Sequence, residues 1–136
     1  MGKRVFDKFV KECNYPILGA NAIDTATGEP YFQPYEIFYR QGLKIAVVGF
    51  ITPAIPHWIP KKTWEGMRFE DIKESAEKWV KIIQEEEHPD YIVGLMHSGM
   101  NEGIVTPEYK ENATRETAES VEGFDLILYG HDHSSN

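Results

Sequence analysis

The run over residues 43–50 most constrains the fold, because it is apolar nearly throughout and rich in β-branched residues. A strand of this kind is typical of the centre of a sheet that is covered on both faces. An aromatic and β-branched run over residues 35–39 precedes it, and residues 40–42 (Arg-Gln-Gly) separate the two. This spacing predicts a β-hairpin whose second strand lies inside the sheet.

Helical and strand patterns alternate along the second half of the chain. Over residues 69–87 apolar side chains recur on one helical face, and Pro89 ends the pattern. Residues 91–96 and 124–129 have the pattern of short buried strands, and residues 113–121 between them that of a short helix. The alternation of strand, helix and strand predicts the α/β fold class.

Polar positions and turn residues complete the expected layout. On the polar side of the 69–87 helix, i,i+4 spacing predicts the ion pairs Glu74–Lys78 and Glu77–Lys81. Three prolines exclude a regular helix or a central strand between residues 52 and 62. We also expect an amphipathic helix that ends near residues 13–14, a short buried strand over residues 16–21 and a surface loop over residues 25–30.

The charge balance argues against two classes of partner. The chain carries 14 Lys and Arg against 22 Asp and Glu, a formal net charge of −8 with His neutral. Such a balance offers no electrostatic footprint for a polynucleotide or for an anionic membrane surface. It still allows small phosphorylated ligands, because metal ions can supply positive charge locally.

Neither a membrane span nor an export signal is predicted. The longest apolar run, residues 45–51, is far shorter than the roughly 20 residues that cross a bilayer. Charged residues interrupt the first ten positions, so this stretch lacks the apolar region of a secretory signal. The single cysteine, Cys13, has no partner for an internal disulfide, and we expect a partly buried thiol.

Histidines directly follow the last two predicted strands. His97 comes after residue 96, and the run Gly130, His131, Asp132, His133 comes after residue 129. In open α/β sheets ligands collect at the carboxyl ends of strands, so two neighbouring strands would bring three imidazoles together. Neutral imidazole binds zinc and also suits manganese, iron and nickel. We therefore expect His97, His131 and His133 to be metal ligands, with His131 and His133 serving different ions.

Each of these residues also has a simpler interpretation. A histidine after a strand is commonly a hydrogen-bonded core or surface residue, and the chain is then a non-catalytic α/β domain or a single-metal module. Asp132 fits either a partner of an imidazole or a loop carboxylate in solvent. Gly99 and Gly130 would allow close approach to a ligand or a positive φ. His57 and His88 are expected to be solvated.

Residues 14–21, 42–50, 95–99 and 124–133 follow one another in an order that resembles the calcineurin-like metallophosphoesterases. The resemblance is to the second half of that domain, in the branch of 5′-nucleotidases, UDP-sugar hydrolases and 2′,3′-cyclic-nucleotide 2′-phosphodiesterases. Residues 49–53, Trp58 and residues 111–113 (Glu-Asn-Ala) are most similar to the cyclic-nucleotide phosphodiesterase group, which often acts as a 3′-nucleotidase too.

The resemblance implies a four-layer α/β/β/α sandwich with two divalent ions, such as zinc or manganese. By motif, His97 and His131 would bind one ion and His133 the other. The implied reaction is hydrolysis of a nucleotide or another small phosphate ester. We expect a 2′,3′-cyclic-nucleotide 2′-phosphodiesterase/3′-nucleotidase, with a 5′-nucleotidase or UDP-sugar hydrolase as the alternative.

Other motifs of the family do not occur in this sequence. Its Asp-x-His, Gly-Asp and Gly-Asn-His segments and its C-terminal nucleotide-binding domain have no counterpart in residues 1–136. We therefore expect one partial domain, the second half of a catalytic domain, with no catalytic residue of its own. Alone it should be inactive and self-associate through exposed apolar surface. Relatives are mostly exported, which implies a periplasmic or cell-wall parent enzyme.

Overall fold

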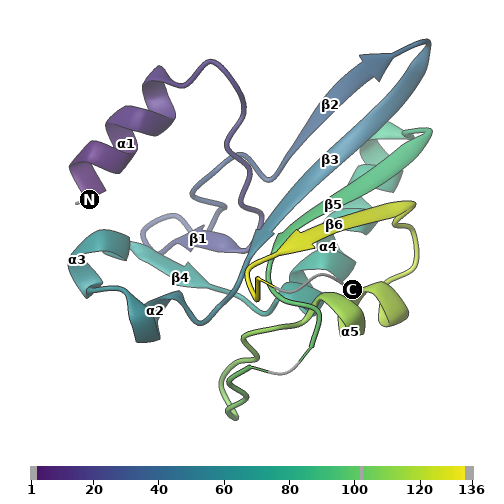
Figure 1. Ribbon diagram of the computed structural model, residues 1–136. Helices are drawn as coiled ribbons and strands as arrows, with labels where there is room; N and C mark the ends of the chain where they lie inside the picture. The colour runs from purple at the N-terminus through teal and green to yellow at the C-terminus, as the bar shows by residue number, and fades with distance from the viewer. Residues whose placement is uncertain (1–2, 102, 134–136) are drawn as a thin grey trace.

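A four-stranded sheet forms the centre of the computed structural model, which describes residues 3–101 and 103–133. Its strand order is β2-β3-β5-β6, with β2 and β3 antiparallel and the other neighbours parallel (Figure 1). The strands are β2 (Tyr35–Arg40), β3 (Leu43–Ile51), β5 (Tyr91–His97) and β6 (Leu126–Gly130). This arrangement confirms the α/β class, the hairpin and the inner position of β3.

Helices pack against one face of this sheet. The structure confirms the two predicted helices as α4 (Ile72–Glu87) and α5 (Thr114–Ser120), and Figure 1 shows α4 behind the sheet. Side chains alternate along a strand, so the even-numbered residues of β3 and β5 share the face toward α4. The buried core there contains Ala46, Val48, Phe50, Ile72, Ala76, Val80, Ile83, Ile92 and Met96. Burial of this apolar surface is the main force that holds the two layers together.

The ends of α4 have clear local causes. The Asp71 side chain accepts a hydrogen bond from the backbone N–H of Glu74 at 3.0 Å, which caps the first turn. At the other end His88 has a φ of 47°, a left-handed conformation that ends the helix directly before Pro89. Phe69, where the helical pattern begins in the sequence, lies in a strand instead.

The polar side of α4 carries different ion pairs from those predicted. The predicted pairs Glu74–Lys78 and Glu77–Lys81 are wrong, and the structure pairs Lys73 with Glu77 at 3.8 Å and Lys81 with Glu85 at 3.9 Å. Lys81 has a glutamate four positions away on either side, and spacing alone does not distinguish them. Such exposed helical pairs add only about 0.3–0.5 kcal/mol each, so α4 depends on its apolar face.

A smaller antiparallel sheet of β1 (Ala22–Asp24) and β4 (Met67–Phe69) lies beside the main one. The strand predicted over residues 16–21 is therefore wrong, although Leu18 makes an isolated bridge to Gln33. Asn21 explains the difference, because its buried side chain bonds to both backbone polar groups of Ile51, at 2.7 and 2.9 Å. This side chain and one backbone hydrogen bond, from the Ala20 N–H to the Gly49 carbonyl at 2.7 Å, join the segment to β3 in place of a strand ladder.

The N-terminal helix is confirmed as α1 (Lys3–Glu12), coloured purple in Figure 1. A hydrogen bond joins α1 to the segment that follows the predicted loop over residues 25–30. The hydroxyl of Tyr31 donates to Asp7 at 2.8 Å. The free thiol of Cys13 is partly buried, as expected. Among the described residues, no helix has the length and apolar character needed to cross a membrane.

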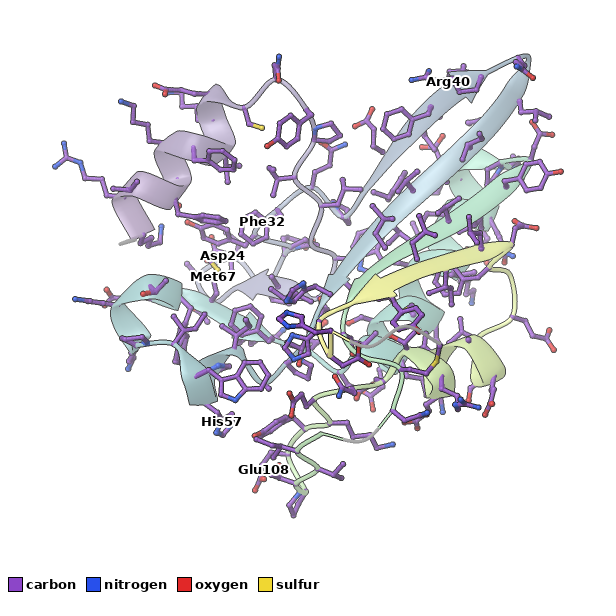
Figure 2. All side chains as sticks on the ribbon, in the orientation of Figure 1. Asp24, Phe32, Arg40, His57, Met67 and Glu108 are labelled. Atoms are coloured by element: carbon purple, nitrogen blue, oxygen red, sulfur yellow. The ribbon has the colours of Figure 1, made fainter. Side chains whose placement is uncertain are left out.

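Residues 52–62 contain helical turns where the sequence predicts none. The single turn α2 (Ile55–Trp58) has Pro56 in its first turn, and α3 (Lys61–Trp64) begins directly after Pro60. The fixed φ of proline is compatible with the start of a helix, so the prolines exclude long helices and not single turns. His57 in α2 is exposed, as is His88. Figure 2 shows His57 at the same end of the molecule as Glu108, with Arg40 at the distant hairpin tip.

The other face of the main sheet is largely open among the described residues. Leu95, Leu126 and Leu128 are 38%, 50% and 52% exposed there. Leu18 covers the sheet at Gly49, where an added Cβ would lie 2.6 Å from the Leu18 Cβ, so only glycine fits. The prediction that residues 124–129 are buried is therefore wrong, whereas on β3 the second face is partly covered, with Ile45 and Val47 half-buried and Gly49 buried. The helices that pack on the sheet lie on the opposite face.

Candidate metal centre

Strands β5 and β6 bring two of the predicted ligands together at one edge of the sheet. They are parallel neighbours, as expected, and His97 of β5 is in register with Gly130 of β6. His131 follows Gly130, so it lies beside His97 at the carboxyl ends of the strands. This is the edge where α/β sheets bind ligands.

The imidazole rings of His97 and His131 face each other through ring nitrogens. Nε2 of His97 lies 3.3 Å from Nδ1 of His131, and the ring centroids are 5.0 Å apart. Two nitrogens bound to one tetrahedral zinc ion, each at about 2.0–2.1 Å, lie about 3.3–3.4 Å from each other. The observed separation is that of a hydrogen bond between the two rings, and it is also close to the separation of two ligands on one ion.

Partial loss of solvent contact favours the neutral form of His97, although the residue is still exposed. Its pKa is lowered below the ordinary value of 6.5, first by burial and then by the neighbouring imidazoles of His131 and His133. A neutral imidazole has a lone pair to donate, and this is the form that binds metal ions. His97 is thus in its ligand form at neutral pH.

Two further side chains hold the ring of His131. Glu111 Oε1 lies 3.1 Å from His131 Nε2, and the side chains are 15% and 18% exposed. Trp58 stacks on the ring, with centroids 5.2 Å apart and planes inclined by 22°. The ring is therefore contacted at both nitrogens and on its face.

Sequence patterns alone do not place Glu111 or Trp58 at the site. Both lie in irregular or single-turn segments, where no periodicity predicts which residues approach the end of β6. The signal that marks them is their resemblance to the cyclic-nucleotide phosphodiesterase group, and that resemblance gives no geometry. The structure adds the contact with His131.

The segment that carries His131 and His133 has an unusual backbone. Its φ is 117° at His131 and 56° at His133, a region that L side chains rarely adopt. Strain of this kind costs about 1–3 kcal/mol per residue and is concentrated at functional sites. Between them Asp132 accepts a hydrogen bond from the backbone N–H of Met100 at 3.0 Å, which ties this segment to the loop after β5.

The predicted positive φ of the glycines beside the histidines is wrong, and their close approach to a ligand stays a prediction. Positive φ occurs at the histidines and not at Gly99 or Gly130. A Cβ at Gly99 would lie 2.7 Å from side-chain oxygens of both Asn112 and Asp132, so the close approach is to the chain itself. Asn112 Oδ1 accepts the Gly99 N–H at 2.7 Å, which joins the residues after β5 to those before α5.

His133 is exposed and does not join the pair of His97 and His131. Within residues 3–101 and 103–133, no group of three or more His, Cys, Asp or Glu side chains is arranged to hold a metal ion. The described donors therefore fit one ion with two protein ligands, and they do not by themselves hold two ions. The assignment of these three histidines as metal ligands stays a prediction.

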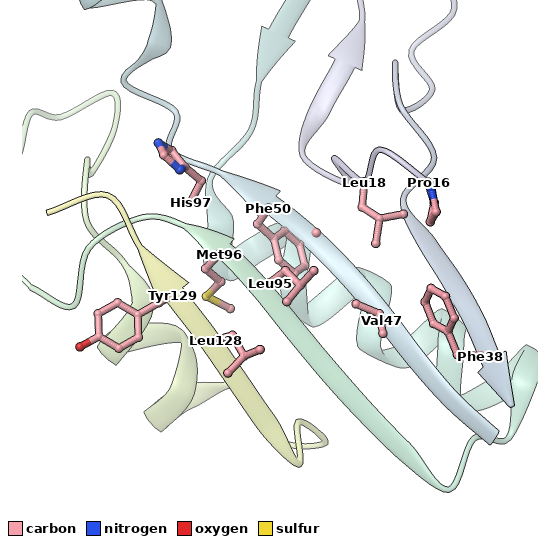
Figure 3. A pocket seen from close by; sticks show the side chains of 11 residues that line it. Pro16, Leu18, Phe38, Val47, Phe50, Leu95, Met96, His97, Leu128 and Tyr129 are labelled. Atoms are coloured by element: carbon pink, nitrogen blue, oxygen red, sulfur yellow. The ribbon is translucent and has the colours of Figure 1, made fainter. Parts of the chain in front are cut away.

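An apolar depression of about 530 Å³ extends from His97 along the open face of the sheet. Figure 3 shows Phe38, Val47, Leu95 and Leu128 along it, with His97 at one end. Among the residues that the structure describes, no lysine or arginine lines it. Binding of a phosphate group would therefore depend on the histidine edge and not on this apolar surface.

Comparisons with known proteins point to one group of hydrolases. No family model matches the chain. A 5′-nucleotidase of Vibrio cholerae is 41% identical over 86 residues, which are 63% of this chain and 16% of that protein. A 2′,3′-cyclic-nucleotide 2′-phosphodiesterase/3′-nucleotidase of Yersinia enterocolitica is 30% identical over 138 residues, covering 93% of this chain and 20% of that protein.

A solved structure has the same fold. The crystal structure of the calcineurin-like phosphoesterase YfkN from Bacillus subtilis matches with a TM-score of 0.84 and 32% identity, over 98% of this chain and 42% of that one. The chain thus spans less than half the length of each of these three proteins. It is homologous, over that minor share of their length, to the calcineurin-like phosphoesterases of the 5′-nucleotidase and 2′,3′-cyclic-nucleotide phosphodiesterase family.

Proposed function

We propose that this chain supplies metal ligands to the active site of a metal-dependent nucleotide phosphoesterase. The observation that carries the proposal is the 3.3 Å separation of His97 Nε2 and His131 Nδ1 at the ends of two parallel strands. Homology to phosphoesterases supports the reaction class. In this role the chain corresponds to the second half of a catalytic domain, and the remaining ligands come from outside residues 1–136.

The histidines have distinct roles in this proposal. His97 and His131 hold one divalent ion, zinc or manganese, and His133 serves a second. A pair of such ions binds the phosphate group and lowers the pKa of the attacking water. The positive charge of the site would allow a chain with a net charge of −8 to accept an anionic substrate.

The substrate class that we favour is 2′,3′-cyclic nucleotides and 3′-nucleotides. The match to the Yersinia phosphodiesterase extends over 93% of this chain, against 63% for the Vibrio 5′-nucleotidase. A 5′-nucleotidase or UDP-sugar hydrolase is the second candidate. Its support is the higher identity of 41% within the shorter match.

Steady-state kinetics of the protein that contains these residues test the proposal. We would compare kcat/KM on 2′,3′-cyclic AMP, 3′-AMP, 5′-AMP and a UDP-sugar, with zinc or manganese present. Hydrolysis of the first two substrates at least as efficient as that of 5′-AMP is the expected result. Dominant turnover of 5′-AMP or the UDP-sugar would support the second candidate instead. A protein that binds no divalent ion and hydrolyses none of the four is a non-catalytic α/β domain.

A further inference from the structure

We propose that Glu111 is a positioning residue, which fixes the proton of His131 on Nε2 and so points the lone pair of Nδ1 at the metal position. This role rests on the proposed metal site and adds to it a residue that sequence patterns do not place there. Its support comes from the main chain of Glu111, from its carboxylate and from the surroundings of the imidazole.

The main chain of Glu111 is fixed to the ends of two strands. Its carbonyl oxygen accepts hydrogen bonds from Thr52 Oγ1 at 2.7 Å and from Ser98 Oγ at 3.1 Å. Thr52 and Ser98 directly follow β3 and β5, and both are fully buried. The backbone N–H of Glu111 donates to the carbonyl of Ile104 at 2.9 Å. The backbone is thus held without help from the carboxylate.

The two carboxylate oxygens of Glu111 have different partners. Oε1 faces His131 Nε2 at 3.1 Å, and Oε2 accepts the backbone N–H of Ile104 at 2.6 Å. A carboxylate only accepts hydrogen bonds, so neutral His131 carries its proton on Nε2. The lone pair is then on Nδ1, which faces His97. Metal-binding histidines commonly donate their other N–H to a carboxylate in this way, and the contact fixes both tautomer and ring orientation.

Trp58 limits rotation of the His131 imidazole, in addition to the contact with Glu111. Its indole lies nearly parallel to the imidazole of His131, with an interplanar angle of 22° and 5.2 Å between centroids. A rotation of the imidazole out of this stack would break its contacts with Glu111 and His97 together. The carboxylate therefore sets which nitrogen is protonated, and the indole helps to keep that nitrogen in place.

Two substitutions of similar size separate this role from a packing role. Glu111→Gln keeps a side-chain oxygen that can accept the N–H of His131, whereas Glu111→Met has similar length and no such oxygen. When the amide oxygen of the Gln variant accepts the N–H of His131, neither variant has an acceptor for the backbone N–H of Ile104. A difference between the two variants is therefore due to the contact with His131. Glu116→Met is the matched control, because it removes a carboxylate that pairs with Lys110 instead.

Nitrogen-15 NMR of the metal-free chain reads the tautomer of His131, and calorimetric titration with zinc reads the affinity. The wild type and Glu111→Gln should keep the proton on Nε2. Glu111→Met should shift the population toward the Nδ1-protonated form and lower zinc affinity by about 10- to 100-fold. Glu116→Met should match the wild type in both measurements.

Wild-type tautomer populations and wild-type zinc affinity in Glu111→Met would overturn the inference. Equal losses in Glu111→Gln and Glu111→Met, with the amide oxygen of the Gln variant facing His131, would also overturn it, because the carboxylate would then act through packing or through Ile104. Absence of zinc uptake by the longer protein that contains these residues counts against the proposed function. In that case the NMR comparison, which uses no metal, still decides the role of Glu111.

Discussion

Thr52 donates a 2.7 Å hydrogen bond from its hydroxyl to the carbonyl oxygen of Glu111, a residue 59 positions further along the chain. Thr52 is fully buried, and its own hydroxyl oxygen, Oγ1, accepts the backbone N–H of Ala54 at 3.3 Å. One hydroxyl thus joins the end of β3, the start of the proline-rich segment and the loop that reaches His131. The position of Glu111 depends on the core as well as on its own loop.

Thr52→Val should destabilise the fold. Valine keeps the shape of threonine but leaves the buried N–H of Ala54 without its acceptor, so we expect the free energy of unfolding to fall by about 1–3 kcal/mol. Urea unfolding followed by circular dichroism measures the change. Thr52→Ser retains the hydroxyl and should stay closer to the wild type. Equal losses in the two variants would assign the effect to the methyl group and contradict the role of the hydrogen bond.

Alanine at His97, His131 or His133, introduced into the protein that contains these residues, should remove bound metal and most activity. His97 and His133 are exposed, so their variants should change the free energy of unfolding by less than about 1 kcal/mol, whereas His131→Ala should cost more because it removes the contacts with Glu111 and Trp58. Metal content by mass spectrometry and turnover would be measured for each variant. His88→Ala is the control, because His88 is exposed at the end of α4. Wild-type occupancy and turnover in all three variants would refute the ligand assignment.

The 136-residue chain by itself should bind one divalent ion weakly and hydrolyse phosphodiesters little or not at all. The described residues offer two paired imidazoles and no carboxylate that could bridge two cations and offset their repulsion. Calorimetric titration with zinc and manganese, beside an assay on a chromogenic phosphodiester, measures both properties. Tight uptake of two ions with efficient turnover would show that residues 1–136 hold a complete site.

Self-association of the chain should depend on the open face of the sheet. Leu128 is 52% exposed there, beside other exposed leucines, and contiguous apolar surface of this kind promotes association. Leu128→Lys should therefore shift sedimentation profiles toward the monomer. Val105→Lys introduces the same charge at a residue that is 64% exposed in the loop between β5 and α5, and it should leave the profile unchanged. Equal shifts in the two variants would point to net charge as the cause.

The contact between Lys44 and Glu87 should make stability depend on pH. Lys44 Nζ lies 2.8 Å from Glu87 Oε2, and the pKa of Glu87 is lowered below 4.5, first by Lys44 and then by Tyr35. A carboxyl group with a lowered pKa in the folded state stabilises the fold above its unfolded pKa, and the contribution is lost as pH falls through the folded value. The pKa of Lys44 is raised above 10.5 by Glu87, so its contribution is lost as pH rises beyond that value.

Lys44→Met should therefore reduce stability between about pH 4.5 and 10.5 and flatten its decline at both ends of this range. Thermal unfolding measured across the pH range tests the prediction. Lys81→Met is the control, since Lys81 is 75% exposed and lies 3.9 Å from its partner. A wild-type pH profile in the Lys44 variant would show that the ion pair does not contribute to stability.

Sequence patterns predict the elements of this fold better than its contacts. The apolar stripe of α4 and the hairpin around Gly42 follow from local periodicity and turn chemistry, and the strand ends that carry His97 and His131 follow with them. The contact of Glu111 with His131 was not predictable in this way, because hydrogen bonds to the ends of β3 and β5 set it. Apolar composition likewise predicted a cover on both faces of β3, but composition does not say which segment provides it.

At His131 and His133 the positive φ values favour glycine, whereas metal binding needs histidine. Glycine would adopt φ values of 117° and 56° without strain, and it would remove the imidazole. Selection for a more stable chain and selection for a metal-binding chain would therefore act in opposite directions at these two positions. A descendant that no longer needed the ion would gain stability by replacing the histidines with glycine. We therefore expect the sequence of this segment to change early in any lineage that no longer binds the metal.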